Sequence, residues 1–231
     1  MNDTPRSPLH RRTFFSRLAA GVAAFTAGAG TAGAQSAQSS PFQPARHPED
    51  DWYDTLPGKH RFFVDTNSPL GAGDGLGFAS NFLAASRSGY SLGDSDSAIV
   101  ICVRHDSTPY AWTDEIWAKY GEHISKEQRF NDPKTNKLQA VNMYLTTGYG
   151  DLLPNREITL TALAKRGVHY AVCGLSTRKY AGIIARATSS TPDAAFKELT
   201  SNMIPNAHLV AAGVVAVNRA QERGYTLLYV G

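Results

Sequence analysis

The sequence predicts an α/β protein in which a mostly parallel, five-stranded sheet lies between helices on both faces, a three-layer arrangement. Short apolar segments alternate along the chain with longer segments that carry helix start and stop residues. The segment 98–103 is apolar throughout, which is typical of a parallel strand buried on both faces. With 231 residues, of which 42% are hydrophobic, the chain can bury one sizeable core.

Five segments have the composition of strands, and they lie at residues 61–65, 98–103, 168–173, 208–211 and 225–230. The helical segments between them are expected at residues 79–89, 113–121, 155–167, from 191 onward and at 212–223. Their signals are Thr191 followed by Pro192, a strong helix start, and the glycines at which several segments stop. Strands and helices that alternate in this way form parallel sheets with right-handed crossovers.

Two stretches depart from this alternation. Residues 71–77 contain four glycines between the first strand and the first helix, where dinucleotide-binding folds place theirs. Leu76 occupies the position of a required glycine, and Asp74 puts a negative charge where a pyrophosphate would bind, so we expect a flexible loop. The polar stretch 122–154 is expected to be an insertion with a lid-like or intersubunit role.

The first 34 residues have the pattern of an export signal. Arg11 and Arg12 precede two aromatic residues, a weakly hydrophobic stretch follows, and a small-residue motif ends at Ala34 before Gln35. This order predicts a twin-arginine signal, cleavage near that bond, and a periplasmic or otherwise exported protein that folds before export. The apolar run is too short and too rich in glycine to span a membrane, so we expect no span in the mature protein.

The charge distribution excludes one class of function. Residues 1–34 contain four arginines and one aspartate, which account for the whole net charge of +3. The mature chain is therefore charge-balanced, and it lacks the basic excess that nucleic-acid binding requires. Residues 35–58, rich in proline and polar residues, are predicted to be a flexible tether onto which Trp52 and Tyr53 dock, and residues 59–231 to be the domain.

Candidate site residues follow the predicted strands, because ligands of open parallel sheets bind beyond the carboxyl ends of the strands. The first strand leads to Asn67, and the second leads to Arg104, His105 and Asp106. The third ends at Cys173, and Ser176 and Arg178 follow in the next helix. Asn67, Arg104, Asp106 and Ser176 are candidates for binding a ligand, and His105 is a candidate for acting as a base or for holding a proton for Cys173.

Cys173 is the sharpest of these positions. It ends a strand and begins a helix, where amide groups and the nearby cations Arg178 and Lys179 would stabilise a thiolate. The alternative is a buried, inert thiol, which is the expectation for Cys102 within its apolar strand. A third alternative is a disulfide between the two, which an oxidising compartment allows.

No metal or cofactor is expected. His169 and His208 lie at the amino ends of their strands, opposite to Cys173 and His105, so these four residues cannot surround one ion. The chain also lacks a nucleophilic-serine motif of the hydrolase type.

Three segments together resemble the DsrE/DsrF-like family of sulfur-relay proteins. They are residues 99–105, residues 167–174 and the tail 210–226, and the resemblance covers about residues 59–231. It implies a flavodoxin-like arrangement of five parallel strands, assembly into trimers or hexamers, and a persulfide on the cysteine that follows a central strand, here Cys173. The exported branch of this family is similar in its amino-terminal signal, whereas the sulfur-relay members are cytoplasmic and lack the 122–154 stretch.

Three functions therefore remain open. The first is a persulfide carrier that uses Cys173, exchanging sulfur with a donor or acceptor protein. The second is a non-enzymatic module of the same fold, with a structural Cys173, in which the carboxyl edge of the sheet and the stretch 122–154 bind a small ligand or a protein. The third is a thiol–disulfide redox role. In each case the expected partners include further copies of the chain and the twin-arginine export machinery.

Overall fold

The computed structural model describes residues 42–231, and the predicted signal, its cleavage point and residues 35–41 lie outside them. The chain divides into two units at Pro44, and residues 44–231 form one compact unit. Within residues 42–231, no helix combines the length and the apolar character that crossing a membrane needs.

The core of the fold is a sheet of five parallel strands. The strands are β1 (His60–Thr66), β2 (Ser97–Val103), β3 (His169–Cys173), β4 (Ala207–Val210) and β5 (Thr226–Val230). Their order is β4-β3-β2-β1-β5, and all four neighbouring pairs are parallel. Every predicted strand is thereby confirmed. The order differs from the 2-1-3-4-5 order of flavodoxin, because β1 to β4 advance in one direction and β5 returns to the far side of β1.

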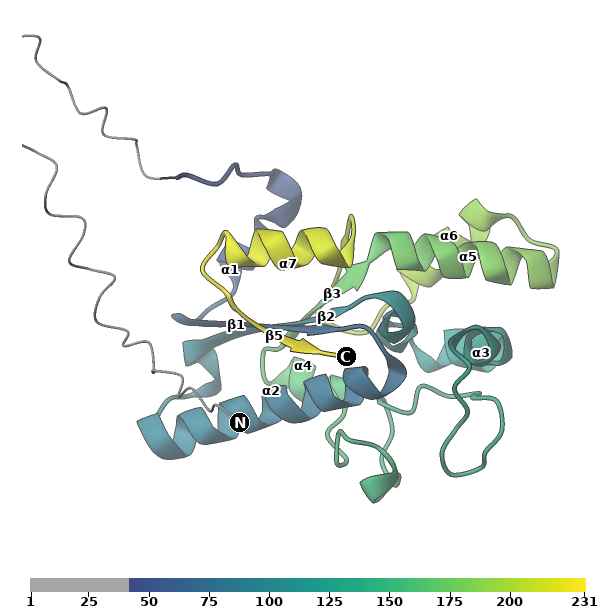
Figure 1. Cartoon of the computed structure of the whole chain (residues 1–231), viewed down its shortest axis with the longest axis horizontal. Coiled ribbons are helices and arrows are strands. Elements are labelled where there is room, and N and C mark those ends of the chain that lie inside the picture. Colours follow the sequence, from purple (N-terminus) through teal and green to yellow (C-terminus); the bar gives the residue numbers. More distant parts are fainter. Residues whose placement is uncertain (1–41) are drawn as a thin grey trace, which may run out of the picture. The chain divides into compact units, whose positions relative to one another are not determined.

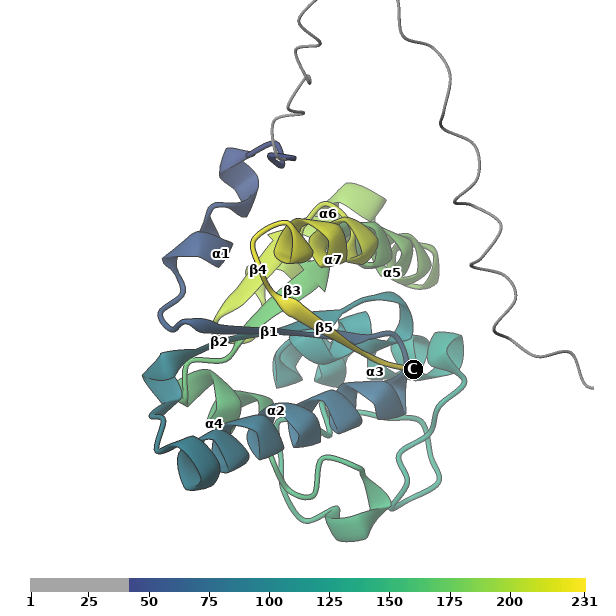
Figure 2. The same cartoon turned by 60° about the vertical axis from the view of Figure 1, so that its left-hand side comes forward.

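Helices cover both faces of the sheet, as predicted. Helices α2 (Pro69–Tyr90) and α4 (Leu160–Lys165) pack on one face, and α7 (Gly213–Gln221) and the short α1 (Trp52–Thr55) pack on the other (Figures 1 and 2). The side chains of β2 alternate accordingly: Ile99, Ile101 and Val103 face α2, and Ala98, Val100 and Cys102 face α7. Helices α3 (Asp114–Gln128), α5 (Gly174–Thr188) and α6 (Pro192–Ser201) form a separate group, in which α5 packs on both others.

The handedness of crossovers explains why α7 lies opposite to α2. The connection from β1 to β2 advances along the sheet in one direction, and the connection from β4 to β5 runs in the reverse direction. Because crossovers between parallel strands are right-handed, reversing the direction places the connecting helix on the other face. The helical residues buried on that face come from α7 and from the segment around α1.

The glycine-rich stretch 71–77 is helical, so the prediction of a flexible loop is wrong. Helix α2 begins at Pro69, after Ser68 caps it by accepting a hydrogen bond from the amide of Gly71. A Cβ atom on Gly73 would lie 2.7 Å from the Tyr144 hydroxyl oxygen, and one on Gly71 would lie 2.9 Å from the carbonyl oxygen of Gly231. Gly71, Gly73 and Gly75 are required by close packing, and the helix tolerates them because that packing offsets their low helix propensity.

Helix α3 also extends further than predicted, because Gly121 lies inside it and does not end it. The segment around Gln139 and Ala140 packs so closely on Gly121 that any side chain there would overlap its backbone. The helix ends at Arg129, whose φ of 52° is left-handed. Similarly, the helix predicted from Asn155 begins only at Leu160, after Thr159, which caps it.

The connection between α3 and α4, which makes up most of the predicted insertion, is partly buried. It contains only the short 3-10 helix η4 (Gly150–Leu152), yet Met143, Tyr144 and Leu153 are buried in the main core. The side-chain Nδ2 of Asn142, a fully buried residue, donates to the carbonyl oxygens of Tyr110 and Trp112, both at 2.8 Å. The predicted insertion is therefore part of the domain core.

The predicted tether is ordered from Pro44 onward and belongs to the compact unit. It forms the 3-10 helix η1 (Pro48–Asp50) and α1. Tyr53 is fully buried among residues of the α7 face, and Asp54 lies 3.2 Å from the Arg223 guanidinium. The indole of Trp52 stacks on His208 at 3.9 Å. The predicted docking of Trp52 and Tyr53 thus occurs, but the domain begins about 15 residues earlier than predicted because this segment completes the α7 face.

Candidate functional site

Three loops meet at the carboxyl edge of the sheet and bring together most of the predicted site residues. The amide of Asp106 donates to the carbonyl oxygen of Asn67 at 3.1 Å, which joins the loops after β2 and β1. The amide of His105 donates to Ser176 Oγ at 2.9 Å, which joins the loop after β2 to the start of α5. Hydrogen bonds donated by backbone amides therefore hold the three loops together.

Cys173 lies at the amino end of α5 as its N-cap residue. Its Sγ accepts a hydrogen bond from the amide of Ser176 at 3.4 Å, and its side chain is almost fully buried. Gly174 follows, where a Cβ atom would lie 2.7 Å from the carbonyl oxygen of Val210, so the end of β4 closes one side of the site. The amides at a helix amino terminus carry partial positive charge, and one of them contacts Sγ here.

His105 follows β2 with an uncommon backbone conformation. Its φ is 56°, which is left-handed, a region that non-glycine residues adopt at a cost. Its ring is 64% exposed, and its Nδ1 lies 3.3 Å from Asp106 Oδ2. The imidazole is therefore accessible to solvent while its backbone is fixed by Ser176.

Asp106 is the centre of a hydrogen-bond network below His105. Its carboxylate accepts a hydrogen bond from the Tyr180 hydroxyl at 3.0 Å and lies 3.7 Å from Lys179 Nζ. Its carbonyl oxygen accepts from Gln128 Nε2 at 2.6 Å. Burial, with the charge of Asp106 as a further cause, raises the pKa of Tyr180, so this hydroxyl stays protonated and acts as a donor.

Arg104 forms an ion pair that turns its charge away from Cys173. Its guanidinium donates to both carboxylate oxygens of Asp65, at 2.8 and 3.0 Å, and lies 5.8 Å from the centre of the Tyr229 ring. Asn67 donates to the Tyr229 hydroxyl at 2.7 Å. These bonds direct Arg104 and Asn67 toward β1 and β5, whereas Cys173 ends β3. Sequence reasoning placed Asp65 at this edge but missed its pairing with Arg104 and missed Tyr229, although a carboxylate inside an apolar strand is itself a signal of a buried partner.

Arg178 does not contribute to the site, contrary to the prediction. Its guanidinium lies 3.6 Å from Asp193 and 4.1 Å from the centre of the Phe196 ring, both on α6. The cation directed at this edge is Lys179, one residue later. Successive residues of a helix are rotated by about 100°, so a shift of one position selects a different face.

The two cysteines are both free, and the register does not favour a disulfide. Cys102 is opposite Ala171, so Cys173 lies two residues further along the neighbouring strand. With the spacings of a parallel sheet, the two Cα atoms are about 8 Å apart. A disulfide needs Cα atoms closer than about 7 Å, so pairing would require the backbone to move.

Cys102 has the core environment that the sequence predicted. It is fully buried on the α7 face. Burial first, and then the charge of Asp65, raise the pKa of the Cys102 thiol well above its usual value. The thiol therefore stays protonated, and Cys102 is a poor nucleophile.

His169 and His208 lie at the amino ends of β3 and β4, as predicted, and contact each other there. The distance from His169 Nδ1 to His208 Nε2 is 2.9 Å, and Trp52 stacks on His208. Among residues 42–231, no group of three or more histidine, cysteine or acidic side chains is arranged to hold a metal ion.

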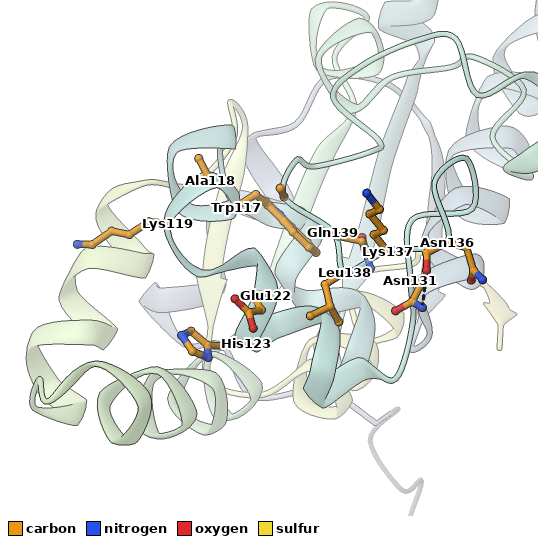
Figure 3. Close-up of a pocket in the computed structure, with 11 residues that line it drawn as sticks. Trp117, Ala118, Lys119, Glu122, His123, Asn131, Asn136, Lys137, Leu138 and Gln139 are labelled. Atoms are coloured by element: carbon orange, nitrogen blue, oxygen red, sulfur yellow. Dashed lines mark hydrogen bonds between the residues drawn. The ribbon is translucent and has the colours of Figure 1, made fainter.

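A cavity of about 690 Å3 lies between α3 and the segment 131–140 (Figure 3). It contains none of the residues named as candidates for catalysis or ligand binding, but eight of its eleven lining residues belong to the stretch 122–154. Its lining is mostly polar and charged, and consists of Trp117, Ala118, Lys119, Glu122, His123, Asn131, Asn136, Lys137, Leu138, Gln139 and Ala140.

The fold and the site define a three-layer α/β protein that holds a thiol at the amino end of a helix. No family model matches the chain, and no curated protein matches it. A solved structure of a protein of unknown function from Methanobacterium thermoautotrophicum is similar, with 12% identity and a TM-score of 0.36. The match covers 74% of this chain and 99% of that one.

Proposed function

We propose that this protein is an exported carrier of sulfane sulfur in which Cys173 holds the transferred atom as a persulfide. The observation that carries the proposal is the Cys173 Sγ at the amino end of α5, where it accepts the amide hydrogen bond of Ser176. A cysteine attacks as a thiolate, and a persulfide transfers sulfur as an anion. The amino terminus of a helix stabilises both anions. The resemblance to sulfur-relay proteins supports the same position.

The transfer needs no outside oxidant. The Cys173 thiolate attacks the outer sulfur of a donor persulfide, a sulfur–sulfur bond forms, and the donor leaves as a thiolate. An acceptor thiolate then attacks the outer sulfur on Cys173, and the Cys173 thiolate leaves in turn. Each step exchanges one sulfur–sulfur bond for another, so the number of electrons is conserved.

Burial of the thiol is compatible with this role. Only 5% of Cys173 is exposed, which protects the free thiol from larger reagents. A persulfide extends the side chain by one sulfur–sulfur bond of about 2 Å, so the transferred atom is the outermost atom of the residue. Cys102 cannot compete for sulfur because it is fully buried and protonated.

The test is a pair of single-cysteine proteins treated with tetrasulfide. The Cys102→Ala protein retains Cys173 and should gain about 32 Da in intact mass, lost again on reduction. The Cys173→Ala protein retains Cys102 and should gain nothing. Loading of Cys173→Ala, or no loading of Cys102→Ala, would overturn the proposal.

A second candidate function is binding of a small polar ligand, and the cavity beside α3 favours it. Its size falls within the range of small-molecule sites, and Lys119, Glu122 and Lys137 are among its lining residues (Figure 3). This function does not use the thiol, so Cys173→Ala should leave ligand binding unchanged. A Leu138→Trp substitution fills the cavity and should abolish it, as thermal-shift screening of small polar metabolites would show.

Export and assembly are parts of the same proposal. The twin-arginine pattern at Arg11 and Arg12 supports export, and the resemblance supports a trimer or hexamer. Replacing both arginines by lysine should retain the precursor inside the cell. Light scattering of the mature protein should give three or six chain masses.

A further inference from the structure

His105 is held more rigidly than an exposed loop residue needs to be. Its left-handed backbone, with φ of 56°, is fixed by the hydrogen bond from its amide to Ser176 Oγ. The next residue, Asp106, is fixed by two hydrogen bonds. Its amide donates to the carbonyl oxygen of Asn67, and its carbonyl oxygen accepts from the side chain of Gln128. Strained conformations that several bonds maintain are concentrated at functional sites.

The ring of His105 is oriented as well. Asp106 Oδ2 lies 3.3 Å from Nδ1, and the other carboxylate oxygen, Oδ1, accepts from the fully buried Tyr180. A carboxylate at this distance stabilises a proton on Nδ1, which leaves Nε2 as the proton acceptor. Because the ring is 64% exposed, an approaching molecule can reach it.

Ser176 connects this histidine to the thiol. Its amide donates to Cys173 Sγ at 3.4 Å, and its hydroxyl oxygen accepts from the amide of His105 at 2.9 Å. One residue therefore contacts both the sulfur and the segment that carries the imidazole. The exposed base and the buried sulfur lie on two sides of the same serine.

We infer that His105 is the base that removes the proton from an acceptor thiol as it attacks sulfur held on Cys173, and that Asp106 positions its ring. The inference rests on the proposed function and adds the class of acceptor, a thiol that arrives protonated. The proton moves from the acceptor sulfur to His105 Nε2, and the acceptor sulfur bonds to the outer sulfur of Cys173. The bond between Cys173 Sγ and the outer sulfur breaks, and Sγ keeps the electron pair of that bond, so Cys173 leaves as a thiolate.

The charged and titratable groups around His105 come from three elements. Asp106 belongs to its own 3-10 helix, η3 (His105–Ala111), and Lys179 and Tyr180 belong to α5. From α3, Glu127 lies 2.8 Å from Lys179 and neutralises it. The carboxylate of Asp106 is therefore the dominant charge next to the ring.

The experiment compares two acceptors for sulfur already loaded on Cys173. 2-Mercaptoethanol must lose a proton to react, whereas sulfite at pH 8 has no thiol proton to lose. Intact mass follows the discharge of each from the unaltered mature protein, from His105→Asn and from Asp106→Asn. Asparagine is chosen because it tolerates the left-handed conformation. His60→Asn, an exposed histidine at the start of β1, is the matched control.

His105→Asn should slow discharge to 2-mercaptoethanol at pH 7 by about tenfold or more and leave discharge to sulfite unchanged. The remaining rate to the thiol should rise more steeply with pH, because only thiolate already present in solution then reacts. Asp106→Asn should have the same selective effect but a smaller one, and His60→Asn should have none.

Equal slowing with both acceptors, or no slowing with either, would overturn the inference while the carrier function stands. If the unaltered protein takes up no sulfur, both the inference and the proposed function fail. Loading is measured first, so the two failures are distinguished.

Discussion

At the scale of single residues, the two cysteines show how position in a sheet determines chemistry. Cys102 lies inside a strand, and Cys173 ends the neighbouring strand two residues further along. The first is fully buried with its pKa raised by burial, and the second accepts a hydrogen bond from a helix amide. The inert thiol and the thiol that contacts a helix amide are therefore only a few ångströms apart along the strand direction.

The capping role of Cys173 predicts that stability and function respond differently to substitution. Serine is a preferred N-cap residue, because its oxygen accepts the same amide hydrogen bond better than sulfur does. We expect Cys173→Ser to be about 1 kcal/mol more stable than Cys173→Ala in urea unfolding. Both proteins should fail to take up sulfur. Equal stability of the two variants would contradict the capping role.

At the scale of elements, α2 shows that glycines in a sequence indicate either a flexible loop or close packing against a helix. Glycines concentrated before a helix predict a loop, because glycine is conformationally free and a poor helix former. In α2 the same residues allow Tyr144, the carboxyl-terminal residue and β1 to approach the helix axis. The contacts come from segments up to about 160 residues away, so no local pattern could have indicated them.

This interpretation predicts opposite effects at two glycines of α2. Gly73→Ala would place a methyl group 2.7 Å from the hydroxyl oxygen of buried Tyr144, and should destabilise the protein by about 1–3 kcal/mol. Gly89→Ala meets no atom within 4 Å and should stabilise it by about 0.5–1 kcal/mol. Urea unfolding of both variants measures this. A destabilising Gly89→Ala would show that helix propensity is not the controlling term there.

At the scale of the whole molecule, the amino-terminal segment and the sheet depend on each other. Helix α7 alone of the crossover helices packs on its face, and α1 covers the area beside it. Asp54 and Tyr53 attach this segment to the domain, and Trp52 covers the imidazole pair at the amino edge. Removing residues 44–58 would therefore expose side chains of the core, and would not merely shorten a flexible tether.

The imidazole pair predicts that acid weakens the fold. Burial first, and the charge of His169 second, lower the pKa of His208 from 6.5 to about 4. Between these values the unfolded chain binds a proton that the folded protein does not, so the free energy of unfolding decreases as pH falls. The contribution is complete above pH 6.5 and is lost as pH falls through about 4.

The measurement is urea unfolding at pH 7 and at pH 4.5 for the unaltered protein, His208→Asn and His60→Asn. The loss of stability on acidification should be smaller in His208→Asn, because asparagine does not titrate. His60→Asn should lose as much stability as the unaltered protein, since it retains His208 and the same carboxylates. The same loss in all three would contradict the role of His208.

The sequence by itself determined the parallel α/β class, all five strands, the edge of the sheet that carries Cys173, and the burial of Cys102. These follow from hydrophobic periodicity and from capping residues, which act over a few positions. Only the tertiary structure decided which side chains meet: Arg104 with Asp65, Arg178 with α6, Tyr144 with Gly73, and Trp52 with His208. These contacts join segments distant in the chain and depend on helix rotation and strand order, and a rotation of about 100° between Arg178 and Lys179 selects which cation faces the site.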